Sequence, residues 1–330
     1  MVALAVSLAA SRDADAQAKT VRLSYQFGLG FLTVLVVLDQ HLIEKNAEKL
    51  GVQGVKSTGV QLSGAAITND ALLSGSIDLA AGGVGGLLQL WDKTNGGVKG
   101  IAALNDMALV LNTNDPKIKT LKDYVGVTNH KIALPAVKVG LHAIVLQMGA
   151  QKTLGLGKQY DLDKLTLSLP HPDGYAALVS GHGEVHSHFT SQPFAYLEQH
   201  SSNKNIHQVL SSYDVLGGAH NNTIMYTTAK WAKANPKLLQ ATFNAVSEAE
   251  SWINANPKAA AEFFKTKTKS KLSVPDIQAI LSNPKLAAYG PAPKATMKFA
   301  EFYYKIGRIK HEPSSWKDYF WEVAYKLNGS

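Results

Sequence analysis

The sequence predicts an α/β protein whose two lobes face one ligand cleft. A helix, a short strand and a glycine-rich turn follow one another between residues 61 and 86. A strand, a loop and a helix return in the same order after Lys131, so the two halves of the chain share one organisation. The chain beyond Thr223 reads as helical. Two α/β lobes around a cleft are the simplest architecture that accounts for this pattern.

The first half begins with a strand over residues 21–25, a loop at Gln26 and a helix expected over residues 31–50. In the next unit Ser63 is the expected N-cap of a helix that ends at Gly75. A strand over residues 77–81 then leads into the turn at residues 82–86. Ligands sit at such strand ends in open α/β sheets, but the glycines are equally consistent with tight packing. Both interpretations stay open.

The second half repeats these units. A strand over residues 131–134, a loop over 135–140 and a helix over 142–154 correspond to the first strand, loop and helix. The stretches that follow form a strand, a helix and a strand at 165–169, 173–180 and 184–189. They correspond to the stretches 55–60, 63–74 and 77–81 of the first half.

Asn-Pro pairs separate the first three helices expected in the last third, because proline is favoured in a first helical turn. They cover residues 230–235, 236–254, 257–265, 275–281, 293–306 and 316–327. Their aromatic side chains are expected to pack in the core rather than to form a ligand cage.

Composition excludes several classes of protein. The chain has 330 residues, of which 45% are hydrophobic, and no apolar run reaches the roughly 18 residues of a membrane span. The net charge of +8 comes mainly from single lysines after Lys258, which are typical of solvated helix faces rather than of a nucleic-acid site. Cysteine is absent, which excludes disulfides and thiol chemistry.

The N-terminus indicates secretion. Residues 2–10 form a short apolar core, and Ala16-Gln17-Ala18 matches a signal-peptidase site, although no basic segment precedes the core. We therefore expect residues 1–18 to be a signal-peptide remnant. The mature chain would begin near Lys19 in the periplasm.

Three stretches carry a family resemblance. They are SGAAITNDALLSGSIDLAAGGVGG, KIALPAVKVGLHAIVLQMGAQKTLG and NPKLLQATFNAVSEAESWINANPKAAAEFF. Each is unspecific alone, but their order and spacing resemble the substrate-binding proteins of bacterial ABC importers for nitrate, sulfonate and taurine, a family that includes binders of thiamine precursors. The resemblance covers residues 21–325.

This resemblance implies a two-lobed periplasmic-binding-protein fold of type II, with two hinge strands and a ligand enclosed between the lobes. Residues 19–112 plus 218–330 would form the first lobe, and residues 113–217 the second. It also implies a monomer that docks on a membrane permease. The ligand would be a small organic anion of the sulfonate, taurine or carboxylate type, without any cofactor. A heteroaromatic such as a pyrimidine is the alternative ligand.

The resemblance also suggests which residues face the ligand. In the first lobe they are Gln26, Phe27, Ser63, Gly64, Ala65, Gly82 and Gly83. In the second lobe they are Lys138, Val139, Gly140, His188, Phe189 and Thr190. Family members often carry a hydroxyl residue at the position of Val139 or Gly140, so one hydrogen bond to an oxyanion is missing here. Lys138 and His188 would supply charge instead, and the body of the ligand would rest on Phe27 or Phe189.

Two other classes of function remain as alternatives. Glu184, His186 and His188 would share one face of a strand, and His182 lies nearby, so a metal site is conceivable. Pyrimidine synthases of thiamine biosynthesis have a similar fold, but their eukaryotic relatives carry a cysteine-rich motif that this chain lacks. We expect a binding protein rather than an enzyme, with no catalytic residues and no bound metal.

Overall fold

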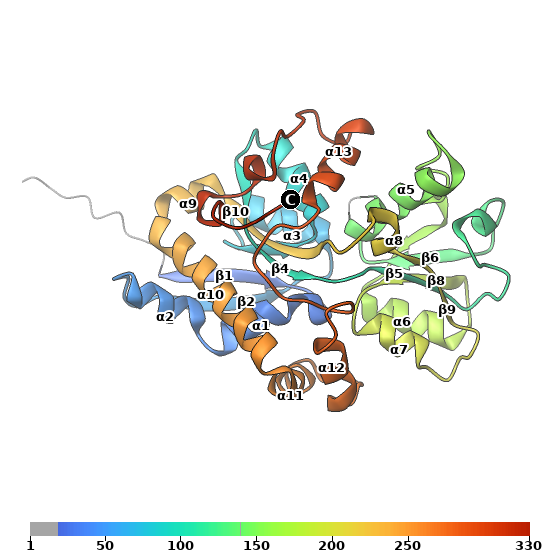
Figure 1. Cartoon of the computed structure of the whole chain (residues 1–330), viewed down its shortest axis with the longest axis horizontal. Helices are drawn as coiled ribbons and strands as arrows, with labels where there is room; N and C mark the ends of the chain where they lie inside the picture. The colour runs from blue at the N-terminus through green and yellow to red at the C-terminus, as the bar shows by residue number, and fades with distance from the viewer. Residues whose placement is uncertain (1–18, 139) are drawn as a thin grey trace, which may run out of the picture.

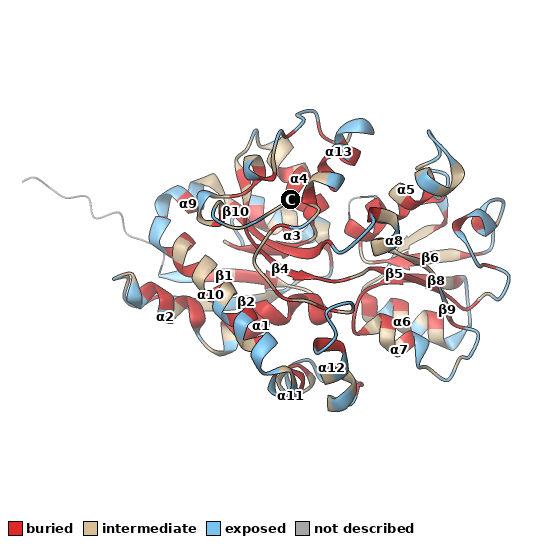
Figure 2. Ribbon diagram, viewed as in Figure 1, coloured by how far each residue is buried: buried red, intermediate tan, exposed pale blue. Residues whose placement is uncertain are grey.

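The computed structural model describes residues 19–138 and 140–330. The expected signal segment, its cleavage site near Ala18, and Val139 lie outside the described residues. Two lobes, each built on a sheet with helices against it, stand side by side (Figure 1). The inner strands of the two sheets are largely buried, and the helices have exposed faces on the outside of the molecule (Figure 2).

The sheet of the first lobe has the strand order β2-β1-β3-β10-β4, in which the pair β1–β2 and the trio β3–β10–β4 meet at a parallel bridge between Leu23 and Leu79. Its strands are β1 (Thr20–Tyr25), β2 (Lys56–Gln61), β3 (Ala80–Gly82), β4 (Val98–Asp106) and β10 (Asn221–Thr228). Arg22 on β1 forms two side-chain hydrogen bonds of 2.9 Å with Asp78, which anchors the segment leading into β3.

The sheet of the second lobe has the order β7-β6-β8-β5-β9. Its strands are β5 (Val110–Thr113), β6 (Lys131–Leu134), β7 (Thr166–Ser168), β8 (Val185–Thr190) and β9 (His207–Ser211). In both sheets the first three strands run parallel and the last two pairings are antiparallel. The repeated organisation expected from the sequence is therefore confirmed.

Helices cover both sheets. The first lobe holds α1 (Leu32–Asp39), α2 (Leu42–Lys49), α3 (Ala65–Leu73), α4 (Val84–Lys93), α9 (Ala229–Ala234), α10 (Pro236–Ala255), α11 (Pro257–Thr268), α12 (Val274–Leu281) and α13 (Thr296–Lys305). The second holds α5 (Leu141–Leu154), α6 (His171–Ser180), α7 (Phe194–Gln199) and α8 (Ser212–Leu216).

The chain passes between the lobes twice, from β4 into β5 and from α8 into β10. Because β5 pairs only within the second sheet, we propose that the first crossing lies at residues 107–109 rather than at the expected boundary of 112. The lobes also share apolar packing, since one hydrophobic cluster includes Val84 and Leu87 of α4 together with Leu141 and Ile144 of α5.

Several expected elements differ in the structure. The helix expected over residues 31–50 is two helices, because His41 adopts a left-handed conformation with φ of 52°. Ser63 does not cap α3; Gly64 occupies that position without a side-chain hydrogen bond. The expected strand at 77–81 is β3, which begins only at Ala80. The expected turn at 82–86 is largely the first turn of α4.

The chain after Thr223 is not purely helical, because β10 is a central strand of the first sheet. The last expected helix is instead two short 3-10 turns, Trp316–Tyr319 and Glu322–Ala324. The sequence analysis also missed α7, β9 and α8, whose short segments carry little periodicity.

Candidate functional site

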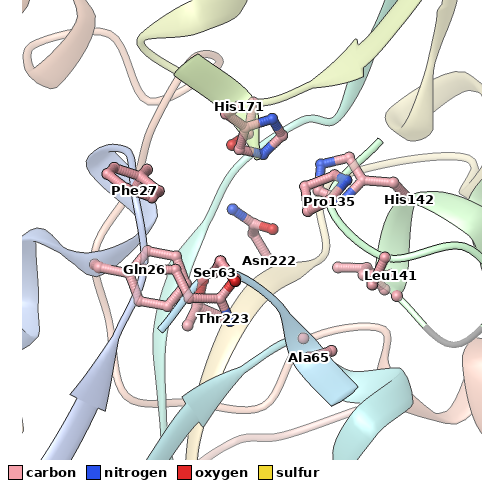
Figure 3. Close-up of a pocket in the computed structure, with 15 residues that line it drawn as sticks. Gln26, Phe27, Ser63, Ala65, Pro135, Leu141, His142, His171, Asn222 and Thr223 are labelled. Atoms are coloured by element: carbon pink, nitrogen blue, oxygen red, sulfur yellow. The ribbon is translucent and has the colours of Figure 1, made fainter. Parts of the chain in front are cut away.

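A cavity of about 50 Å³, here called the inner cavity, lies between the lobes (Figure 3). The first lobe contributes Gln26, Phe27, Phe31, Ser63, Ala65, Gly83, Asn222 and Thr223 to its lining. The second lobe contributes Pro135, Ala136, Gly140, Leu141, His142, His171 and Ser191. Both lobes thus reach any molecule held there.

Three helices begin at the inner cavity. The N-caps of α3, α4 and α5 are Gly64, Gly83 and Gly140, and none of these helices has a side-chain hydrogen bond at its cap. The first N–H groups of a helix have no partner within it, and the helix dipole adds partial positive charge at that end. Their convergence creates a favourable place for an anion.

Polar side chains complete the first-lobe wall. Asn222 is 8% exposed, and among the described residues its amide Nδ2 has only a long contact of 3.9 Å with the sulfur of Met107. Thr223 is 2% exposed and lies beside Asn222 within β10. Gln26 enters from the end of β1, where the sequence predicted a polar contact. These groups can donate to, or accept from, a bound molecule.

Two histidines form much of the second-lobe wall. His142 stands at the second position of α5 and His171 at the first position of α6, with ring centroids 5.0 Å apart (Figure 3). His142 is 8% exposed, and its Nε2 atom is buried without a hydrogen-bond partner among the described residues. A ligand group that hydrogen-bonds to this nitrogen would remove the cost of leaving it unpaired.

Burial keeps both rings neutral. It lowers the pKa of His142 to about 3, with His188 and His220 adding repulsion. It also lowers the pKa of His171 well below its ordinary value, and the neighbouring His142 and His188 act in the same direction. A neutral imidazole offers one donor and one acceptor, so each ring can serve either role toward a ligand.

A buried chain of hydrogen bonds stands behind His171. Its Nδ1 lies 3.0 Å from Nε2 of His188, and Nδ1 of His188 lies 2.5 Å from a carboxylate oxygen of Glu198. The other oxygen of Glu198 accepts from the amide of Asn112 at 2.8 Å. His188, Glu198 and Asn112 are fully buried.

A second cavity of about 410 Å³, here called the outer cavity, shares Gln26 and Phe27 with the inner one. Apolar and aromatic side chains of both lobes line it, among them Tyr25, Leu35, Tyr175, Phe194 and Phe264. Lys267, Lys269 and Lys271 also line it, while its lining contains no acidic residue among the described part of the chain. Lys267 pairs with Asp39 at 3.0 Å.

Six of the residues predicted to face the ligand line the inner cavity, namely Gln26, Phe27, Ser63, Ala65, Gly83 and Gly140. Gly64 and Gly82 adjoin these positions but do not line it. The assignment of all eight as ligand contacts stays a prediction. Val139 lies outside the described residues.

The other predicted contacts lie away from the cavity. Lys138 is exposed, and its carbonyl oxygen accepts from Arg308 at 3.1 Å. His188 and Thr190 contact His171, and Phe189 packs edge-on against His142, with all three fully buried. They lie behind the wall because α6 covers the end of β8 with its own first residue.

His142, His171 and Asn222 were missed as ligand-facing residues. The positions of the two histidines at the starts of α5 and α6 could have indicated them, since helix starts face the cleft in this architecture. Asn222 had no such signal, because the strand that carries it was not predicted.

No group of three or more histidine, aspartate or glutamate side chains in the described residues is placed to hold a metal ion. His188 uses both ring nitrogens in hydrogen bonds.

In the part of the chain that is described, no helix is long and apolar enough to cross a membrane.

Known structures share the fold. The alkanesulfonate-binding protein SsuA from Xanthomonas axonopodis pv. citri, bound to MOPS, has a TM-score of 0.68 and 17% identity, over 90% of this chain and 96% of that one. The nitrate-binding protein NrtA from Synechocystis PCC 6803 has a TM-score of 0.68 and 18% identity, over 90% and 83%. The aliphatic sulphonate binding protein SsuA from Escherichia coli has a TM-score of 0.66 and 17% identity, over 95% of both chains.

These similarities establish the two-lobed fold of periplasmic binding proteins. No curated protein sequence matches the chain. The sequence profile of the NMT1-like family matches residues 15–267, which is more than half of the 330 residues. The chain therefore belongs to the NMT1-like family.

Proposed function

We propose that this protein is the solute-binding component of an ABC importer, which captures a small organic anion of the sulfonate, taurine or carboxylate type. The observation that carries the proposal is the convergence of three helix N-termini without side-chain caps on the inner cavity. An oxyanion can accept from these N–H groups and from neutral His142 or His171 without a full counter-charge.

The outer cavity supports an organic rather than an inorganic anion. Phe27 lines both cavities, so a head group in the inner cavity can continue into an apolar body that rests on this ring. The lysines on the far side of the outer cavity favour ligands without a positively charged tail. By this argument an alkanesulfonate or a carboxylate is favoured over taurine, whose amine is cationic at neutral pH.

Delivery of the ligand to the importer would depend on closure of the two lobes. A ligand that contacts both lobes favours the state in which they are closed, to the extent that its contacts differ between the open and closed states. The closed form would then dock on a membrane permease. We propose that the protein does this as a periplasmic monomer, after cleavage near Ala18, and that it performs no catalysis.

A heteroaromatic such as a pyrimidine remains the second candidate. The observation that favours it is that Phe27 lines the same cavity as neutral His142 and His171. Each neutral imidazole can accept from an amino group as well as donate. A flat ring would stack on Phe27 while its polar edge met the histidines.

The test is a thermal-shift screen of the purified protein against alkanesulfonates, taurine, nitrate, aromatic carboxylates and pyrimidines. A ligand that binds only the folded protein raises the unfolding midpoint with its concentration. We expect a dose-dependent rise with sulfonates or carboxylates. A rise with pyrimidines alone would replace the first candidate by the second. Mass spectrometry of the supernatant after denaturation detects any ligand that co-purifies.

A further inference from the structure

The chain from Glu198 through His188 to His171 joins a buried carboxylate to the wall of the inner cavity. It crosses three elements, since Glu198 lies on α7, His188 on β8 and His171 on α6. Each link is a direct contact of 3.0 Å or less. The Nε2 atom of His171 has no partner among the described residues, so the end of the chain is available to a ligand.

Packing fixes the middle of the chain. A methyl group on Gly174 of α6 would stand 2.6 Å from Nε2 of His188, so glycine is what lets α6 approach this ring. Asn112 holds the second oxygen of Glu198, and Thr190 Oγ1 lies 3.2 Å from His171 Nδ1. Because the rings are held in place, a change at this site alters which ring nitrogens carry hydrogen rather than where the rings lie.

Counting the protons gives a constraint. An anion in the cavity accepts only, so His171 must present a hydrogen on Nε2. If His171 is neutral, its Nδ1 must then accept, and His188 must donate from Nε2. His188 also donates from Nδ1 to Glu198, so it carries a proton on both nitrogens and is positively charged. Without that extra proton, both rings carry hydrogen on Nδ1. Nε2 of His171 then presents a lone pair to the cavity and cannot donate to an anion.

We propose that Glu198, acting through His188, makes His171 a hydrogen-bond donor toward an anion, so that anion binding is coupled to the uptake of one proton. The inference rests on the proposed function, because it assumes an anion in the inner cavity. The proton comes from solvent and stays on His188, where the carboxylate of Glu198 balances its charge. Glu198 is therefore a positioning residue rather than a ligand contact.

The surroundings fit this role. His142 on α5, Tyr175 on α6 and His220 before β10 are the other titratable groups that face the chain and the rings beside it. All three are uncharged at neutral pH, since burial raises the pKa of Tyr175 and lowers those of His142 and His220. Glu198 thus supplies the balancing charge for the proton.

The first test is calorimetric titration with ethanesulfonate, which stays ionised between pH 7 and 9. Tris and triethanolamine buffers carry no anionic group and differ in ionisation enthalpy, so the difference in observed heat counts the protons taken up. We expect uptake to rise toward one proton per site as the pH increases, with affinity falling by up to tenfold per pH unit. Binding with no uptake and constant affinity across this range would overturn the proposal.

Glu198→Gln keeps the shape of the side chain and removes its charge. We expect this variant to lose the proton uptake and to bind ethanesulfonate at least tenfold more weakly at pH 7. His182→Gln, in an exposed loop, is the matched control and should keep both. A purely structural role for Glu198 would lower the unfolding midpoint and leave the proton count unchanged.

A ligand-free measurement separates this proposal from the proposed function. Long-range nuclear magnetic resonance correlations of ring nitrogens at pH 9 should show hydrogen on Nδ1 of both His171 and His188, with signals assigned from His171→Gln and His188→Gln. Hydrogen on Nε2 of His171 under these conditions would contradict the proposed direction of the hydrogen bonds from His171 through His188 to Glu198. If both rings carry hydrogen on Nδ1 but no sulfonate binds, the proposed ligand is rejected while the hydrogen-bond arrangement of Glu198, His188 and His171 stands.

Discussion

Burial decides what individual side chains can offer a ligand in this protein. His171 lies in the inner cavity as a neutral ring, whereas the ammonium of Lys138 lies in solvent outside it. A neutral donor in a buried cavity contributes more to affinity than an exposed charge, because water and salt screen the latter. The residue that touches the ligand is therefore more important than the residue that carries the charge.

We predict that His171→Gln weakens sulfonate binding by about tenfold, the value of one hydrogen bond of roughly 1.4 kcal/mol. Lys138→Ala should change the affinity by less than about twofold, since its side chain is exposed. Calorimetric titration of both variants with one sulfonate measures the contrast. A larger loss from Lys138→Ala than from His171→Gln would contradict the placement of the site.

Glu250 on α10 allows a second prediction at this scale. It is 1% exposed, both carboxyl oxygens lack a hydrogen-bond partner among the described residues, and burial raises its pKa well above the ordinary value. Above the pKa of the unfolded state, unfolding releases a proton from Glu250, so this residue reduces stability increasingly as the pH rises.

Glu250→Gln should therefore stabilise the protein at pH 8 by on the order of 1 kcal/mol, with little gain at pH 4.5. Urea unfolding at both pH values measures this. Glu248→Gln, on the exposed side of the same helix, is the matched control and should change stability by less than about 0.5 kcal/mol. A gain that is independent of pH would show that the carboxyl is ionised in the folded protein.

The sequence placed residues that follow strands in the site with mixed success. Gln26 and Phe27 were placed in the site because they end the first strand, and both line the inner cavity. His188 was placed there by the same reasoning, but α6 covers the end of β8 and puts His171 between them. Which side chain reaches the cleft depends on how two elements pack, and no local pattern records that.

At the scale of elements, the contact between α4 and α5 joins the two lobes. A methyl group on Gly85 of α4 would stand 2.1 Å from Ile144 Cδ1 of α5 and 2.6 Å from the hydroxyl of Tyr303. The glycine-rich stretch thus both reaches the inner cavity and allows tight packing. Gly83 lines the cavity at a helix start, and Gly85 allows the close approach of the lobes.

We predict that Gly85→Ala forces α4 and α5 apart, because overpacking of this kind costs about 1–3 kcal/mol. Ligand affinity should fall by at least tenfold, and small-angle scattering with ligand should show a larger radius of gyration than wild type. Gly86→Ala is the control, since its methyl group would come no closer than 3.4 Å to any neighbour. Equal affinity of the two variants would show that closure does not need this contact.

The sequence predicted most elements of the parallel parts of both sheets, because alternating strand and helix patterns with glycine punctuation are strong local signals. It missed β9 and β10, which pair antiparallel with strands distant in sequence. β10 opens with the polar residues Asn221, Asn222 and Thr223, and their burial comes from the packing of β10 between β3 and β4.

At the scale of the whole molecule, buried histidines make the free energy of unfolding depend on pH. Burial lowers the pKa of His142 to about 3 and that of His220 to about 4. Below the ordinary value of about 6.5, the unfolded chain binds protons that the folded protein refuses, so stability is lost as the pH falls through this window.

We predict that unfolding free energy falls by roughly 2 kcal/mol per buried histidine between pH 7 and pH 5. Urea denaturation at pH 5, 6 and 7 gives the slope. His220→Phe should reduce it, whereas His182→Gln, in an exposed loop, should leave it unchanged. A stability that is flat over this range would mean that these histidines are protonated in the folded state.

The most direct test of the central claim is a crystal structure of the complex with 2-bromoethanesulfonate, in which anomalous scattering locates the bromine. The account predicts sulfonate oxygens within hydrogen-bonding distance of the first N–H groups of α3 and α5 and of His171, with the bromine toward Phe27. A sulfonate bound only at Lys267, Lys269 and Lys271 in the outer cavity, with the inner cavity free of it, would contradict the account.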